Sequence, residues 1–181
     1  IDGCKSGQIN ARVAVMITNN EDSKAMQRAI KEDIPHYYLS TKNMGDEDKL
    51  AKRILEVLSK YNIDMIFLAG YMRKLHDSVL DAYDNRVFNI HPALLPKYGG
   101  KGMYGINVHK AVIAAGEKES GVTIHRVNNK YDSGEIVAQT RVPVLEGDDC
   151  DTLAARVLER EHEFLVEIIA RIADGDIPLG N

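Results

Sequence analysis

The residues best suited to chemistry are Asn89 and His91, which lie two apart in the segment Phe88-Asn89-Ile90-His91-Pro92. Side chains two apart on a strand point to the same side of a sheet, so the amide and the imidazole should project together where an apolar strand ends. Buried groups of these types need hydrogen-bond partners, and chemistry is one reason to place them there. The alternative is that both side chains only satisfy backbone groups at the strand end.

A third candidate is Asp132, in the polar turn over residues 128–135. It is the acid best placed to meet His91 across the fold, and a carboxylate near an imidazole favours the protonated ring. A charged His91 beside the Asn89 amide would stabilise a developing oxyanion. The alternative is an aspartate that only caps its turn, which composition alone favours.

Other chemistries find less support. The sequence contains no GxSxG motif for a serine nucleophile. His109, His125 and His162 show no HxH or HExxH spacing, so we expect no metal site. His125 follows apolar Ile124 on a predicted strand, where a satisfied core histidine is commoner than a ligand. The glycine run over 99–102 matches neither GxGxxG nor GxxxxGKS/T.

Length and composition predict a single domain over residues 1–181, because 181 residues of which 44% are hydrophobic suffice for one substantial core. The formal charge of -4, without a basic stripe, argues against nucleic-acid binding. Apolar runs such as 65–70 fall far below the roughly 18 residues of a membrane helix. We therefore expect a cytoplasmic protein without membrane contact, and the sequence leaves open whether it is a monomer or a homodimer.

The elements that must position these residues alternate between strand and helix. Continuous apolar runs predict buried strands, and apolar residues at helical spacing predict amphipathic helices. This alternation predicts an α/β fold with a mostly parallel central sheet flanked by helices. The predicted strands span 12–18, 37–39, 65–69, 87–90, 121–127 and 135–142, the last two as a hairpin-like pair, and the predicted helices span 23–31, 46–61, 107–115 and 151–174.

The beginning of the sequence departs from this pattern. A doubly wound domain normally opens with a strand and a glycine-rich turn, whereas residues 1–5 resemble the end of a helix. We therefore expect that an N-terminal strand is missing from this chain.

Three blocks carry a resemblance to a known family: LAGYMRKL over 68–75, NIHPALLPKY over 89–98 and YDSG over 131–134. With them the sequence resembles the folate-dependent formyltransferases from residue 1 to about residue 176. Within that family, KYGG over 97–100 favours the phosphoribosylglycinamide formyltransferases, also called glycinamide ribonucleotide transformylases.

The resemblance implies a Rossmann-like α/β domain that transfers a formyl group from 10-formyltetrahydrofolate to the amine of glycinamide ribonucleotide in purine biosynthesis. It implies that Asn89, His91 and Asp132 are catalytic, and it places His125 and His109 near the same cleft with weaker assignments. The implied folate-binding residues are Leu68, Tyr71, Met72, Arg73, Leu75, Val127, Asn128, Lys130 and Tyr131, and the implied substrate-binding residues are Pro92 and Glu161.

The expected mechanism is direct transfer without a covalent enzyme intermediate, because no evident nucleophile is present. Two alternatives stay open. One is formyltetrahydrofolate deformylase, in which water is the acceptor. The other is a catalytically impaired folate-binding module, because the family opens with a strand and a glycine- and serine-rich loop that holds the ribonucleotide phosphate at a helix N-terminus. We expect weak phosphate affinity from a sequence without that loop.

Overall fold

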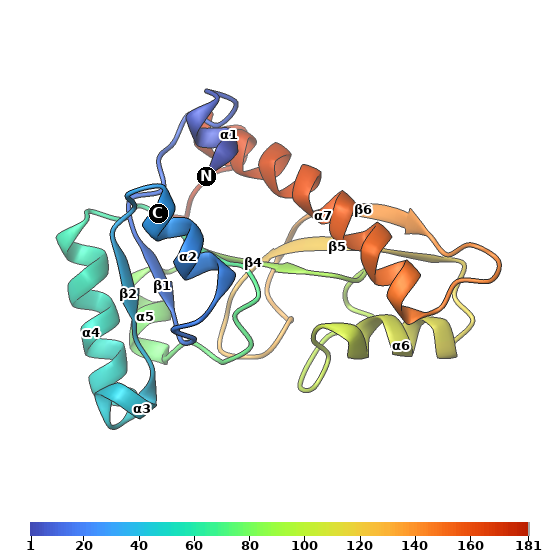
Figure 1. The fold of residues 1–181 in the computed structure, drawn as a ribbon, viewed down its shortest axis with the longest axis horizontal. Helices are drawn as coiled ribbons and strands as arrows, with labels where there is room; N and C mark the ends of the chain where they lie inside the picture. Colours follow the sequence, from blue (N-terminus) through green and yellow to red (C-terminus); the bar gives the residue numbers. More distant parts are fainter. Residues whose placement is uncertain (181) are drawn as a thin grey trace.

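The computed structural model describes residues 1–180, which form short strands interleaved with helices (Figure 1). None of the helices in this range is long and apolar enough to cross a membrane. The elements are α1 (Asp2–Lys5), β1 (Met16–Thr18), α2 (Lys24–Lys31), β2 (His36–Tyr38), α3 (Thr41–Met44), α4 (Glu47–Lys60), β3 (Ile66–Leu68), α5 (Asp77–Ala82), β4 (Val87–His91), α6 (Ile106–Ala114), β5 (Glu119–Arg126), β6 (Ile136–Pro143) and α7 (Cys150–Ala173).

Polar residues start the main helices by satisfying backbone N–H groups that have no partner within the helix. The Ser23 hydroxyl accepts from the N–H of Met26 at the start of α2, and the Asp46 carboxylate accepts from the N–H of Lys49 at the start of α4. Asp149 accepts two such bonds at the start of α7. The helices predicted over 23–31, 46–61 and 151–174 are thus confirmed to within one or two residues.

The strands form two sheets, β1-β2 and β3-β4-β5-β6. The pairs β1/β2 and β3/β4 are parallel, whereas β4/β5 and β5/β6 are antiparallel. The predicted α/β fold and the β5–β6 hairpin are confirmed, but the prediction of a mostly parallel sheet is wrong for this set of pairings. Apolar runs indicate burial, not direction, and the direction of β5 depends on how the chain returns from β4 through residues 92–118.

Two groups of buried side chains stabilise this arrangement. One lies around α4, α5 and the start of β4, and the other lies where α7 packs on β4, β5 and β6. In the second group α7 contributes Leu153, Val157, Phe164 and Ile168, each at most 4% exposed. Burying side chains of this size stabilises the fold by roughly 1.5 to 3 kcal/mol each. These contacts fix β4 and β5 as rigid supports.

Alternation along β4 and β5 separates an apolar face from a polar one. Phe88, Ile90 and Ile124 belong to the core beneath α7. The residues between them are polar, and the antiparallel register pairs Asn89 with His125 and His91 with Thr123. Because paired residues of neighbouring strands lie on the same face, this register gathers four polar side chains.

Candidate active site

His91 lies at the end of β4 and is only 4% exposed. Its Nε2 donates to the carbonyl oxygen of Tyr98 at 2.8 Å, and its Nδ1 lies 3.7 Å from Oδ2 of Asp132. Burial lowers the pKa of His91, and this outweighs the Asp132 carboxylate and the Tyr98 carbonyl, which raise it. Burial therefore disfavours the protonated His91 that the sequence predicted, and the charge state of His91 stays a prediction.

Asp132 connects the β5–β6 turn to the loop that follows β4. It adopts a left-handed conformation, with φ of 51°, which aspartate tolerates better than most residues. Its Oδ2 accepts from the N–H of Gly100 at 2.8 Å. Burial alone would raise the pKa of Asp132, but the neighbouring imidazoles of His125 and His91 and the N–H of Gly100 hold that pKa below its usual value. The structure thus brings this acid beside His91, as predicted.

His125 completes the cluster and is 2% exposed. Its Nε2 lies 3.1 Å from Nδ2 of Asn89 and 3.5 Å from Oδ1 of Asp132, and its Nδ1 donates to the carbonyl oxygen of Arg126 at 2.8 Å. Residue type and spacing favoured a satisfied core histidine, whereas the family resemblance placed His125 near the same cleft. The missing signal was the pairing of β4 with β5, which no single segment reveals.

A buried hydroxyl holds the loop after β4 in place. Thr123 is fully buried; its Oγ1 donates to the carbonyl oxygen of Ala93 at 2.6 Å and accepts from the N–H of Leu95 at 3.1 Å. Nε2 of Gln139 reaches the same Oγ1 at 2.8 Å. The loop that supplies Tyr98 and Gly100 to the cluster is therefore anchored to β5 and β6.

Close packing near Asp132 requires glycine. A Cβ on residue 99 would lie 2.5 Å from Cδ2 of Leu95 and 3.0 Å from Cβ of Asp132. The two segments can approach this closely only because Gly99 has no side chain.

The residues expected to bind folate lie in two neighbouring segments. Leu75 is buried in the core group around α4, and Leu68, Tyr71 and Val127 pack against that group. Met72 and Tyr131 remain 59% and 46% exposed. The remaining members of the set are Arg73, which donates to Thr41 at 3.3 Å, and Asn128 and Lys130, whose turn is closed by a bond from the N–H of Lys130 to the Asn128 side chain.

The residues expected to bind the amine substrate are less clearly gathered. Pro92 follows His91 directly and is half-buried. Glu161 lies on α7, where burial raises the pKa of its carboxyl group. No ion pair or side-chain hydrogen bond joins Glu161 to the cluster within residues 1–180, so its role stays a prediction.

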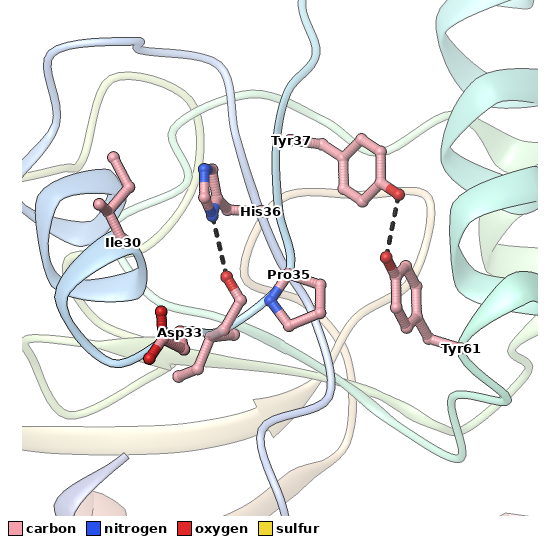
Figure 2. Close-up of a pocket in the computed structure, with 7 residues that line it drawn as sticks. Ile30, Asp33, Pro35, His36, Tyr37 and Tyr61 are labelled. Carbon is pink, nitrogen blue, oxygen red and sulfur yellow. Dashed lines mark hydrogen bonds between the residues drawn. The ribbon is translucent and has the colours of Figure 1, made fainter.

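A separate pocket of about 540 Å³ lies at the start of β2 (Figure 2). Its polar groups bind one another: the hydroxyls of Tyr37 and Tyr61 lie 3.1 Å apart, and Nδ1 of His36 donates to the carbonyl oxygen of Ile34 at 2.9 Å. None of the candidate residues lines this pocket, and we assign it no chemistry.

An amide, two imidazoles and a carboxylate converging at the end of β4 define a site suited to stabilising an oxyanion and moving a proton. The chain belongs to the formyl transferase family, whose model matches residues 1–169. It is 41% identical over 174 residues to phosphoribosylglycinamide formyltransferase, chloroplastic, of Arabidopsis thaliana, covering 96% of this chain and 60% of that protein. It is 35% identical to phosphoribosylglycinamide formyltransferase of Haemophilus influenzae, covering 99% of this chain and 82% of that protein.

The fold matches solved structures as well. Glycinamide ribonucleotide transformylase 1 from Geobacillus kaustophilus superimposes with a TM-score of 0.87 at 34% identity, covering 99% of this chain and 89% of that one. The chain spans 55–60% of the length of two plant relatives, from Arabidopsis thaliana and Vigna unguiculata. The formyltransferase fold expected from the sequence is thus confirmed.

Proposed function

We propose that this protein transfers a formyl group from 10-formyltetrahydrofolate to the amine of glycinamide ribonucleotide, a step of de novo purine biosynthesis. The observation that carries the proposal is the placement of Asp132 3.7 Å from His91, on the polar face that also holds Asn89. Relatives named as phosphoribosylglycinamide formyltransferases support the choice of substrates. The small-molecule substrates agree with the expectation of a cytoplasmic enzyme.

The proposed reaction begins when the amine nitrogen attacks the formyl carbon and the carbonyl electron pair moves to oxygen. The amide N–H of Asn89 donates to this oxygen, and a preorganised donor of this kind typically contributes about 3 to 4 kcal/mol. The attacking nitrogen loses its proton to the neutral His91, and the resulting imidazolium is stabilised by Asp132. The same proton then passes to the folate nitrogen as its bond to the formyl carbon breaks, so no proton is gained or lost.

The surface near this cluster suits a folate. A flat, partly apolar heterocycle needs apolar walls and a few polar groups that fix its orientation. Leu68, Tyr71 and Val127 offer such walls, and the exposed side chains of Met72 and Tyr131 lie within the same two segments. We assign the amine substrate to Pro92 and Glu161, where a half-buried carboxylate would attract an amine.

The test is to measure formyl transfer and formate release side by side. The proposal expects tetrahydrofolate to form only when glycinamide ribonucleotide is present. Release of formate at the same rate without the amine would instead identify a deformylase.

A binding experiment addresses the remaining alternative. Calorimetry with a folate analogue and, separately, with the ribonucleotide should show heat for both ligands if the protein is a transferase. Binding of the folate analogue alone, without turnover, would identify a folate-binding module.

A further inference from the structure

The protonation of His125 is set by its backbone neighbour. Its Nδ1 lies 2.8 Å from the carbonyl oxygen of Arg126, and a carbonyl only accepts hydrogen bonds, so Nδ1 carries a proton. A neutral imidazole has one N–H, and Nε2 of His125 is then a bare acceptor.

The partner of that acceptor is the Asn89 side chain, whose Nδ2 lies 3.1 Å from Nε2. An amide presents a donor at one end and an acceptor at the other, and either end could occupy a given position. A bare ring nitrogen accepts only the NH₂ end. The NH₂ group has two N–H bonds, of which His125 occupies one and leaves the other to donate elsewhere.

We propose that His125 is a positioning residue that fixes the orientation of the Asn89 amide, so that its amino group, and not its carbonyl oxygen, faces the oxygen that gains charge during formyl transfer. This inference deepens the proposed function and rests on it. The reversed amide would place a carbonyl oxygen against a developing oxyanion and would oppose the reaction.

One charged group faces the same ring nitrogen of His125. Asp132 faces Nε2 from the β5–β6 turn, with Oδ1 at 3.5 Å, which is longer than the 3.1 Å contact to Asn89. His125 and Asn89 are directly paired across β5 and β4, and the Arg126 carbonyl holds Nδ1 of His125. The orientation of the amide is thus set by a neighbour that itself has a fixed ring position.

Nuclear magnetic resonance tests the structural part directly. Long-range nitrogen–proton spectra of the protein, with ring nitrogens assigned through a His125→Gln variant, distinguish a protonated ring nitrogen from a bare one. We expect a proton on Nδ1 and a bare Nε2 at neutral pH. A proton on Nε2, with or without one on Nδ1, would overturn the proposal.

A double-mutant cycle in the transfer assay tests the functional part. His125→Leu removes the acceptor, and we expect kcat to fall at least tenfold with KM for the folate changed less than twofold. In the Asn89→Ala background, His125→Leu should leave kcat almost unchanged, because no amide remains to be oriented. Equal losses in both backgrounds would show a merely structural role and overturn the proposal.

Two further variants act as controls. His125→Gln keeps an acceptor oxygen and should retain more activity than His125→Leu, and it also replaces that variant in the cycle if His125→Leu does not fold. Ser120→Ala changes another buried polar side chain of β5, one whose Oγ has no hydrogen-bond partner within residues 1–180, and should leave kcat unchanged. If the wild-type protein transfers no formyl group, the proposed function fails, while the resonance experiment still decides the orientation.

Discussion

Gly134 lies directly against the carbonyl oxygen of Arg126, so that a Cβ on residue 134 would overlap that oxygen. The same oxygen accepts the hydrogen bond from Nδ1 of His125. The glycine of the YDSG block is therefore needed for a physical reason, because it lets the β5–β6 turn close over the backbone group that holds His125.

The first prediction concerns this contact. Gly134→Ala should displace the Arg126 carbonyl, lower the free energy of unfolding by about 1 to 3 kcal/mol, as overpacking does, and reduce kcat. Urea denaturation and the transfer assay check the two effects. Gly147→Ala is the control, since Gly147 has open space around it but a positive φ of 82°: it should lose stability and keep kcat. Wild-type kcat in Gly134→Ala would contradict the predicted link.

The second prediction separates chemistry from binding. Asn89→Ala, His91→Ala and Asp132→Ala should each lower kcat by about 10²- to 10³-fold, the usual effect of removing one preorganised group. The Kd for a folate analogue should change far less, because the expected folate walls lie in other residues. Steady-state kinetics and calorimetry provide both values, and full turnover in all three variants would reject the assignment.

The third prediction concerns the anchor of the loop after β4. Thr123→Val keeps the shape of the side chain but removes a hydroxyl that bonds Ala93, Leu95 and Gln139. Leaving buried polar groups unpaired should cost about 1 to 3 kcal/mol. We expect a lower midpoint in urea with an unchanged slope. Ser120→Ala, on the same strand, should behave like the wild type; equal stability of both variants would show that the anchor contributes nothing.

The fourth prediction concerns the stability of the folded protein at acidic pH. Burial lowers the pKa of His109 and of His91, and a charge on His91 lowers that of His109 further. A histidine in the unfolded chain has a pKa near 6.5, whereas His91 and His109 have lower pKa values in the folded protein. Stability is therefore complete above about pH 6.5 and is lost as the pH falls through the folded values. Urea denaturation at pH 8 and pH 5.5 should show this loss.

A substitution identifies the source of that loss. His109→Leu removes a buried ring whose Nδ1 has no partner within the described residues, so the variant should lose less stability on acidification than the wild type. Ser120→Ala removes no titratable group, so this variant should keep the wild-type dependence of stability on pH. If His109→Leu and the wild type lost the same free energy of unfolding between pH 8 and pH 5.5, the loss would come from other groups.

Local patterns predicted the helices well, because the information lies within each segment. The apolar stripe containing Leu50, Ile54 and Val57 is sufficient to define α4, and Asp46 marks its start. Strand length was predicted less well: the strand was predicted from residue 12 because residues 13–15 are apolar, yet β1 spans only 16–18 because its pairing with β2 covers three residues. Strand direction depends on the path of the chain and is not present in any single segment.

The site shows the same contrast between features that lie within one segment and features that depend on how segments pair. Asn89 and His91 were found because the period of two lies within one strand. Asp132 was found as an acid in a turn, and its approach to His91 follows from the left-handed conformation of that turn and from Gly99. His125 was underestimated because its importance arises from a cross-strand pair, and the effect of burial on the pKa of His91 could not be judged because burial cannot be measured from a sequence.

The carboxylate of Asp132 also joins the β5–β6 turn to the loop that follows β4. One oxygen receives the N–H of Gly100, and the two oxygens lie opposite the inward-facing nitrogens of His91 and His125. Asparagine in its place would keep an oxygen for the N–H of Gly100, but it would carry no negative charge to stabilise an imidazolium at His91. The charge that supports the proposed proton transfer and the contact that joins the two loops therefore reside in one side chain.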